Sequence, residues 1–135
     1  MKRLEPLVGT WNVKTSLGDV RAVTTFEWAL GGAFLLQRSE IDLPEAPDGL
    51  CVIAPDGDDF TQHYFDSRGV VRIYAMTFDG ATWTLTREQE DFSELKFAQR
   101  YVGAFSGNRI DGRWEIKEPG DADYRLDFEL SYERA

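Results

Sequence analysis

The chain has 135 residues, of which 42% are hydrophobic and 13% aromatic, and its formal net charge at pH 7 is −9. This length suits one domain with a buried core, and the composition argues against an intrinsically disordered chain. The negative charge argues against nucleic acid and anionic membranes as partners, because both would repel an acidic surface. We therefore expect a single folded domain over residues 1–135 that binds neither.

The first residues and the cysteine content bear on location. Lys2 and Arg3 are basic, but no apolar core of a signal peptide follows them. No apolar run approaches the roughly 20 residues that a membrane-spanning helix needs. The lone cysteine, Cys51, has no partner for an internal disulfide. We expect a cytoplasmic protein of bacterial type.

Ten short stretches are predicted to be β-strands, starting at Gly9-Thr10-Trp11 and running to the last residues without a convincing helix. Antiparallel strands in sequence order, each turning back on the last, close most easily into an up-and-down barrel. The predicted fold class is therefore all-β, an up-and-down antiparallel β-barrel. Four tight turns support it: Leu17-Gly18-Asp19-Val20, Leu30-Gly31-Gly32-Ala33, Phe78-Asp79-Gly80-Ala81 and Ser106-Gly107-Asn108-Arg109.

The same turns predict which residues lie opposite one another. Directly opposed residues share a face of the sheet, so the turns sort the large apolar side chains onto the barrel interior. The last strand agrees, because apolar residues from Tyr124 to Tyr132 alternate with polar ones. The predicted opposed pairs are Trp11 with Phe26, Trp28 with Leu35, Phe26 with Gln37, Tyr74 with Leu85, Met76 with Trp83, and Tyr101 with Trp114.

Three polar residues share the parity of the inward apolar ones: Gln37, Arg72 and Gln99. An inward arginine is costly unless it is paired or solvated. Arg72 therefore either reaches solvent or a carboxylate at the rim, or anchors the polar head group of a mostly apolar ligand. We expect a non-enzymatic barrel that binds such a molecule. The candidate ligand-binding residues are Trp28, Gln37, His63, Arg72, Tyr74, Trp83, Gln99 and Tyr101.

The orientation of His63 depends on the turn that follows it. A turn over Asp66-Ser67-Arg68-Gly69, with the glycine in the left-handed conformation, pairs Tyr64 with Arg72 and directs His63 outward. A two-residue Arg68-Gly69 loop directs it inward instead, because a slip of one residue reverses every side chain of a strand. The sequence leaves both open.

The residue types give little support for a catalytic site or a metal site. One histidine and one cysteine are too few for a zinc site, and we expect no metal and no cofactor. Two alternatives to a binding protein stay open. One is an enzyme that uses the same cavity, with His63, Arg72 and Tyr74 as the reactive cluster. The other is a filled barrel that serves as a protein interaction module.

Two large apolar residues, Phe34 and Leu36, take the outward parity of their strand. Apolar side chains on a wet sheet face suggest that something covers them. A homodimer through this face is one explanation. A lid formed by the longest irregular loop, Asp42 to Gly49, is the other. A second loop, Glu88 to Glu94, is acidic.

Several motifs together resemble an uncharacterised bacterial family of small lipocalin-like domains in the calycin superfamily, distantly similar to nitrobindins and fatty-acid-binding proteins. The motifs are Gly9-Thr10-Trp11, Leu30-Gly31-Gly32, the segment from His63 to Val70, and Gly112-Arg113-Trp114-Glu115. The resemblance covers nearly the whole chain and implies a calycin barrel of about ten strands, with no activity established. Nitrobindin-like relatives hold haem through a histidine near the C-terminus. No histidine follows His63 here, so haem binding by that route is not expected.

The first and last strands of such a barrel are neighbours, which brings the start of one beside the end of the other. Arg134 is therefore expected to lie over the indole of Trp11 and close that end. The lipocalin-like resemblance implies the same pairing. We expect the ligand entrance at the opposite end, and place it near Gly31-Gly32.

Overall fold

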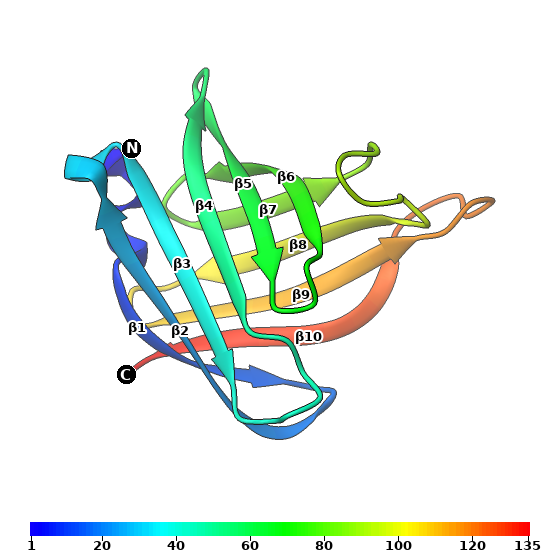
Figure 1. The fold of residues 1–135 in the computed structure, drawn as a ribbon, viewed down its shortest axis with the longest axis horizontal. Helices are drawn as coiled ribbons and strands as arrows, with labels where there is room; N and C mark the ends of the chain where they lie inside the picture. The colour runs from blue at the N-terminus through cyan, green and yellow to red at the C-terminus, as the bar shows by residue number, and fades with distance from the viewer.

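The structure, a computed structural model that describes residues 1–135, is a closed barrel of ten antiparallel strands (Figure 1). Each strand pairs with its neighbours in the chain, and the first pairs with the last. The predicted all-β up-and-down barrel is confirmed. The strands are β1 (Gly9–Thr15), β2 (Gly18–Ala29), β3 (Phe34–Ile41), β4 (Gly49–Asp56), β5 (Asp59–Asp66), β6 (Val71–Phe78), β7 (Thr82–Arg87), β8 (Ala98–Phe105), β9 (Arg109–Lys117) and β10 (Arg125–Arg134).

Two short 3-10 helices, η1 (Lys2–Leu7) and η2 (Leu30–Gly32), depart from the expectation of no helix. A six-residue turn that contains Pro6 is too short for helical periodicity to reveal it. η1 nevertheless has a clear structural role, because Leu4 and Leu7 are fully buried. The indole nitrogen of Trp11 donates to the carbonyl of Leu7 at 2.9 Å, which ties η1 to one end of the barrel.

The predicted contact between Arg134 and Trp11 is confirmed at this closed end. The guanidinium carbon of Arg134 lies 4.1 Å from the centroid of the Trp11 ring. Its nitrogens also donate to the carbonyls of Val8 and Pro6 at 2.9 and 2.8 Å. Gly9 makes room, since a Cβ there would lie 2.9 Å from Arg134 Nη1, and its φ of +128° is one that few L side chains adopt.

Replacing Arg134 with alanine should therefore lower the melting temperature. The cation–π contact contributes roughly 0.5–2 kcal/mol, and the hydrogen bonds to η1 add to it. Ligand binding should change little, because Arg134 lies at the closed end. Thermal unfolding measures the effect, with Arg125→Ala as the control, since Arg125 is an exposed arginine of the same strand. Equal melting temperatures for the two variants would contradict this account of closure.

The turn at Gly31-Gly32 lies at the closed end, so its expected place beside the ligand entrance is wrong. β1 leaves this end and β2 returns to it, which places the β2–β3 turn next to η1. Accordingly, Gly31 and Gly32 share a surface hollow with Met1 and Glu5. The other end of the barrel is the one crossed by the β3–β4 connection, residues 42–48.

The predicted registers are confirmed for two of the four tight turns and wrong for the other two. The pairings of Trp28 with Leu35, Phe26 with Gln37, and Tyr101 with Trp114 are confirmed. Trp11, however, lies opposite Thr24 rather than Phe26, because the chain turns at Ser16-Leu17, between the paired Thr15 and Gly18, instead of at Gly18-Asp19. The error is two residues, so Trp11 and Phe26 still face inward.

The turn after β6 is also longer than its Asp-Gly pair suggests. The side chain of Asp79 accepts hydrogen bonds from the backbone amides of Ala81 and Thr82, which widens the turn. Met76 consequently lies opposite Leu85, in place of the predicted Trp83, and the pairing of Tyr74 with Leu85 is wrong as well. Trp83 pairs with Phe78, again without a change of face.

The alternation predicted for the last strand holds only in its second half. Phe128, Leu130 and Tyr132 face the interior, but Leu126 is 55% exposed. The register of β10 on β9 shifts between Leu126 and Phe128, and this irregularity turns the start of the strand outward.

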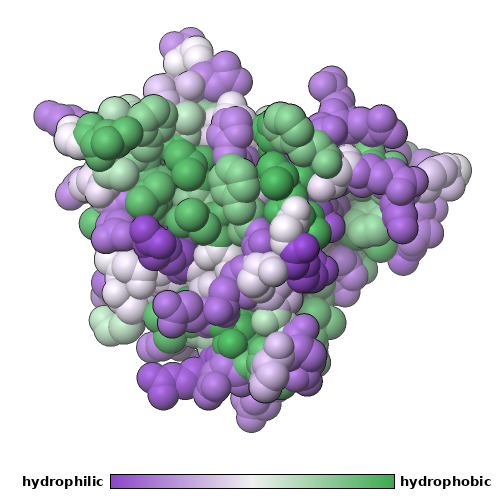
Figure 2. All heavy atoms as spheres, viewed as in Figure 1, coloured by the Kyte–Doolittle hydropathy of each residue, from purple (hydrophilic) through white to green (hydrophobic).

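Phe34 and Leu36 lie on the outer face of β3, as predicted, and alternate with the buried Leu35 and Gln37. Figure 2 shows apolar atoms gathered over the upper part of the molecule, where β3 to β6 lie in Figure 1. The β3–β4 connection starts after Ile41, at the far end of β3 from Phe34. A lid formed by that loop is therefore at the wrong end of the strand.

Candidate functional site

A half-open cavity of about 340 Å³ lies within the barrel, between the closed end and the β3–β4 connection. This volume is at the lower end of the range typical of small-molecule sites, roughly 300–1,000 Å³. Its walls come from β3 to β10 and from the β3–β4 connection, and β1 and β2 contribute no lining residue. The lining residues are Gln37, Ser39, Ile41, Pro47, Gly49, Cys51, Gln62, Tyr64, Arg72, Tyr74, Trp83, Leu85, Gln99, Tyr101, Trp114, Phe128, Leu130 and Tyr132.

Six of the eight candidate residues line this cavity: Gln37, Arg72, Tyr74, Trp83, Gln99 and Tyr101. The other two lie elsewhere. Trp28 lies toward the closed end of β2, where its indole nitrogen donates to Glu5 Oε2 at 2.8 Å. His63 lies on β5 between Gln62 and Tyr64, which both line the cavity, so its own side chain takes the outer face.

The orientation of His63 follows from the turn after β5. Gly69 has a φ of +86°, and its amide donates to the carbonyl of Asp66 at 2.9 Å. Tyr64 pairs with Arg72, which is the first of the two open alternatives. His63 therefore does not join Arg72 and Tyr74 in the cavity, and the reactive cluster of the enzyme alternative does not form.

Three hydrogen bonds within the wall satisfy some of its polar groups. These contacts use the amide and hydroxyl groups that would otherwise be costly to bury. Gln62 Nε2 donates to Gln37 Oε1 at 2.8 Å, the Tyr74 hydroxyl to Gln99 Oε1 at 3.3 Å, and the Tyr101 hydroxyl to the carbonyl of Leu130 at 3.0 Å.

Two buried nitrogens of the wall have no hydrogen-bond partner, Arg72 Nε and Trp83 Nε1. Both are donors. Arg72 forms none of the ion pairs of the structure, so the structural pair considered for it is not formed. The residue is half-buried, which is compatible with the rim position considered for it. A buried donor without a partner costs about 1–3 kcal/mol, which a ligand with an acceptor atom would recover.

Burial keeps the other titratable groups of the wall uncharged at neutral pH. It raises the pKa of Cys51 to about 12 and raises the pKa of Tyr101 and Tyr132. The pKa of Tyr74 is raised by burial as well, although the nearby positive charge of Arg72 opposes that shift. Arg72 is consequently the one residue of the lining with a formal charge.

Aromatic rings form a continuous series along one side of the cavity. The ring centroids of Tyr74 and Trp114 are 5.7 Å apart, those of Trp114 and Tyr101 5.3 Å, and those of Tyr101 and Trp83 5.2 Å. Trp114 was predicted to face inward opposite Tyr101, but was not among the candidate residues. Its parity was the signal that could have added it.

The position of Tyr101 depends on Gly112 of β9. A Cβ at Gly112 would overlap the ring and hydroxyl of Tyr101. Glycine therefore allows the Tyr101 ring to lie against the backbone of β9. The Tyr101 hydroxyl then donates to the carbonyl of Leu130. This contact gives a structural reason for the glycine in the Gly112-Arg113-Trp114-Glu115 motif.

Replacing Gly112 with alanine should lower the free energy of unfolding by about 1–3 kcal/mol, because the ring must move within a packed wall. Urea unfolding measures this change. Gly18→Ala is the matched control, since a Cβ there would meet nothing within 4 Å. If both variants match the unsubstituted protein, Gly112 does not set the position of Tyr101.

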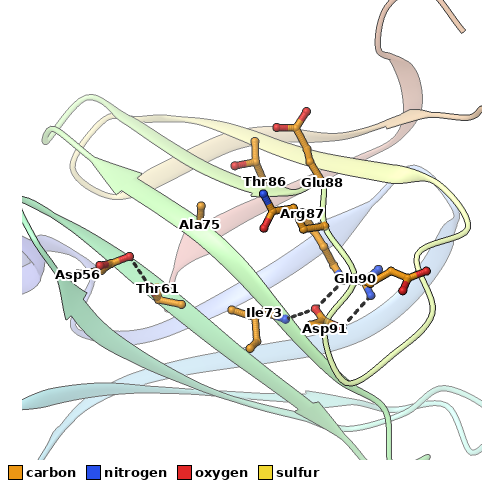
Figure 3. A pocket seen from close by; sticks show the side chains of 10 residues that line it. Asp56, Thr61, Ile73, Ala75, Thr86, Arg87, Glu88, Glu90 and Asp91 are labelled. Atoms are coloured by element: carbon orange, nitrogen blue, oxygen red, sulfur yellow. Dashed lines mark hydrogen bonds and ion pairs between the residues drawn. The ribbon is translucent and has the colours of Figure 1, made fainter.

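A buried ion pair near the open end was missed in the sequence. Arg87 Nη2 lies 2.9 Å from Asp91 Oδ1, and the two side chains are 3% and 7% exposed. Figure 3 shows them pointing toward each other, with Asp91 also accepting from the amide of Ile73 at 2.8 Å. The Ser93 hydroxyl donates to the carbonyl of Val71 at 2.7 Å.

These contacts complete the seam between β6 and β7. The two strands pair only from Ala75 to Phe78 on the β6 side, so Val71 and Ile73 have no partner on β7. Side chains of the 88–97 loop take that partner's place. The signal in the sequence was an arginine at inward parity after Trp83 and Leu85, with an aspartate four residues later.

The hollow drawn in Figure 3 is a weaker candidate for a binding site. Its volume is about 380 Å³, but it lies on the outer surface and four carboxylates line it. They belong to Asp56, Glu88, Glu90 and Asp91. No group of three or more histidine, cysteine, aspartate or glutamate side chains is arranged to hold a metal ion.

The structure contains no helix with the length and apolar character that crossing a membrane requires. Neither a scan of known protein families nor a search of curated proteins finds a match to the chain.

Proposed function

We propose that the protein binds a small, largely apolar molecule inside the barrel and does not transform it. The observation that supports this most is the pair of buried, unpartnered donors, Arg72 Nε and Trp83 Nε1, on the wall of one cavity. Apolar walls with few placed polar groups are typical of small-molecule sites. The volume of the cavity also counts against the alternative of a filled barrel.

The lipocalin-like relationship and a cytoplasmic location are part of the same proposal. Gly9, Trp11 and Arg134 meet at the closed end in the way the resemblance implies. A free, buried Cys51 without a disulfide partner fits a reducing compartment.

Native mass spectrometry of freshly purified protein tests the binding proposal. We expect a fraction of the protein to carry a bound small molecule, which gentle activation releases. Leu130→Trp is the control, because a larger side chain on the wall should fill the cavity and remove the adduct. Its melting temperature must be measured as well, to show that it folds. An adduct that persists in the folded variant would place the molecule outside the barrel.

We also propose that Phe34 and Leu36 form the contact of a homodimer. Their face of the sheet carries little net charge, since Glu27 and Arg38 form an ion pair there at 3.2 Å. Two copies could therefore approach through this face with less repulsion than the overall charge of −9 would cause elsewhere.

Light scattering coupled to size exclusion should show a dimer at high concentration, and only monomer for the double variant Phe34→Ser, Leu36→Ser. Val102→Ser is the control, because Val102 takes the outward parity of β8, on another wall of the barrel. A monomeric unsubstituted protein at high concentration would rule the dimer out.

A further inference from the structure

We propose that the ligand of the cavity is a small aromatic monoanion, a carboxylate, whose charged group Arg72 holds near the open end. This inference rests on the proposed binding function and names the class of molecule that it concerns.

The wall of the cavity carries one charge. Arg72 is the one charged residue among those that line the cavity. Arg87, a fully buried arginine, is neutralised by Asp91 at 2.9 Å. A single positive charge without a counter-ion favours a ligand with one negative charge, because an anion supplies the partner that the protein does not. A dianion would keep one charge unpaired.

The buried polar atoms of the wall that have no hydrogen-bond partner are both donors. They are Arg72 Nε and Trp83 Nε1, whereas Gln62, Tyr74 and Tyr101 donate to acceptors of the wall. The ligand group must therefore accept. A carboxylate accepts two hydrogen bonds from a guanidinium in a planar, bidentate arrangement.

Arg72 and Trp83 lie at different levels along the barrel. Arg72 is the second residue of β6 and pairs with Tyr64, near the turn that ends β5 at Asp66. Trp83 pairs with Phe78 at the other end of β6, toward η1. The charged group thus lies toward the open end, and the body of the ligand extends inward.

A series of aromatic rings lies between these two levels. Tyr74, Trp114 and Tyr101 lead from Arg72 toward Trp83, with centroids 5.2–5.7 Å apart from ring to ring. Rings at this spacing present flat faces and edges on which another ring packs well. The cavity of about 340 Å³ limits the body to a small ring system.

The experiment compares two probes of the same shape by isothermal titration calorimetry at pH 7.4 and low salt: 2-naphthoate and the neutral 2-naphthylmethanol. We expect the carboxylate to bind about 10-fold to 100-fold more tightly to the unsubstituted protein, as a charge-assisted hydrogen bond implies. Arg72→Met should abolish that preference and leave the affinity for the alcohol nearly unchanged. Arg38→Met, on the outer face, should preserve it.

Equal affinities of the two probes for the unsubstituted protein would overturn the inference and leave the proposed function standing. So would a preference for the carboxylate that survives in Arg72→Met. If neither probe binds, the inference fails, and the native mass spectrometry described above decides the proposed function separately. Arg72→Lys refines a positive result, because it keeps the charge but loses the bidentate geometry and should retain only part of the preference.

Discussion

Replacing Trp83 with alanine should lower the free energy of unfolding by about 3–5 kcal/mol, as for other fully buried large side chains. Trp83 is 0% exposed. Its ring packs against those of Phe26, Tyr101 and Tyr132, with centroids 5.9, 5.2 and 5.7 Å away. The substitution removes contacts with three other strands and enlarges a cavity that already exists. Urea unfolding monitored by circular dichroism measures the loss.

Trp83→Phe is the matched control. It keeps an aromatic ring and loses no hydrogen bond to the protein, because Trp83 Nε1 has no partner. Its cost should be well below that of the alanine variant. If Trp83→Ala costs less than about 1 kcal/mol, the ring is not packed as the structure places it.

Asp91→Ala should cost a similar amount, about 3–5 kcal/mol, because it leaves the buried charge of Arg87 without a partner. It also removes the acceptor of the Ile73 amide and opens the seam between β6 and β7. Asp111→Ala is the control, since Asp111 pairs with Arg109 on the surface, where both side chains are more than half exposed. That exposed pair should contribute about 1 kcal/mol or less.

The double variant Arg87→Leu, Asp91→Leu separates two causes of this loss. Replacing both charges by apolar groups avoids the unpaired charge, so it should cost less than Asp91→Ala alone. A double variant as unstable as the single one would show that the hydrogen bonds of Asp91 to the loop and to Ile73 dominate.

The pH dependence of stability follows from the same group. The guanidinium of Arg87 and the amides of Ile73 and Ser93 hold the pKa of Asp91 well below its usual range in the folded protein. A lowered folded-state pKa contributes stability that is complete above the unfolded value, about 3.9, and is lost as the pH falls toward the folded value. Below about pH 4 the unsubstituted protein should therefore lose stability more steeply than Asp91→Asn.

The sequence predicted strand order, faces and barrel closure because each depends on local chemistry or parity. Alternation assigns a face whatever the exact register, so Tyr101 and Trp114 were placed correctly. The predicted registers were wrong where the turn differs from the one its glycine suggests. Asp79 widens its turn with side-chain hydrogen bonds, and the turn between β1 and β2 lies at Ser16-Leu17 instead of Gly18-Asp19. No pattern of apolar residues reveals such contacts.

The cavity wall was predictable to the same extent. Arg72, Gln37 and Gln99 were found by parity, which is a property of single strands. The depth of a residue along the barrel depends on the whole fold and cannot be obtained from a single strand. Trp28 lies opposite Leu35, as predicted, but it lies next to η1 rather than in the cavity. The partners of Arg87 were hidden because they belong to an acidic loop whose charges suggested simple solvation.

The most direct test of binding inside the barrel uses the indole N–H signals of the four tryptophans in a heteronuclear NMR spectrum. Trp83 and Trp114 line the cavity. Trp11 and Trp28 donate to Leu7 and Glu5 at the closed end and serve as internal controls.

Titration with 2-naphthoate, and separately with 2-naphthylmethanol, should shift the signals of Trp83 and Trp114 and leave those of Trp11 and Trp28 in place. Shifts confined to Trp28, or to backbone amides around His63 on the outer face, would contradict a ligand site inside the barrel.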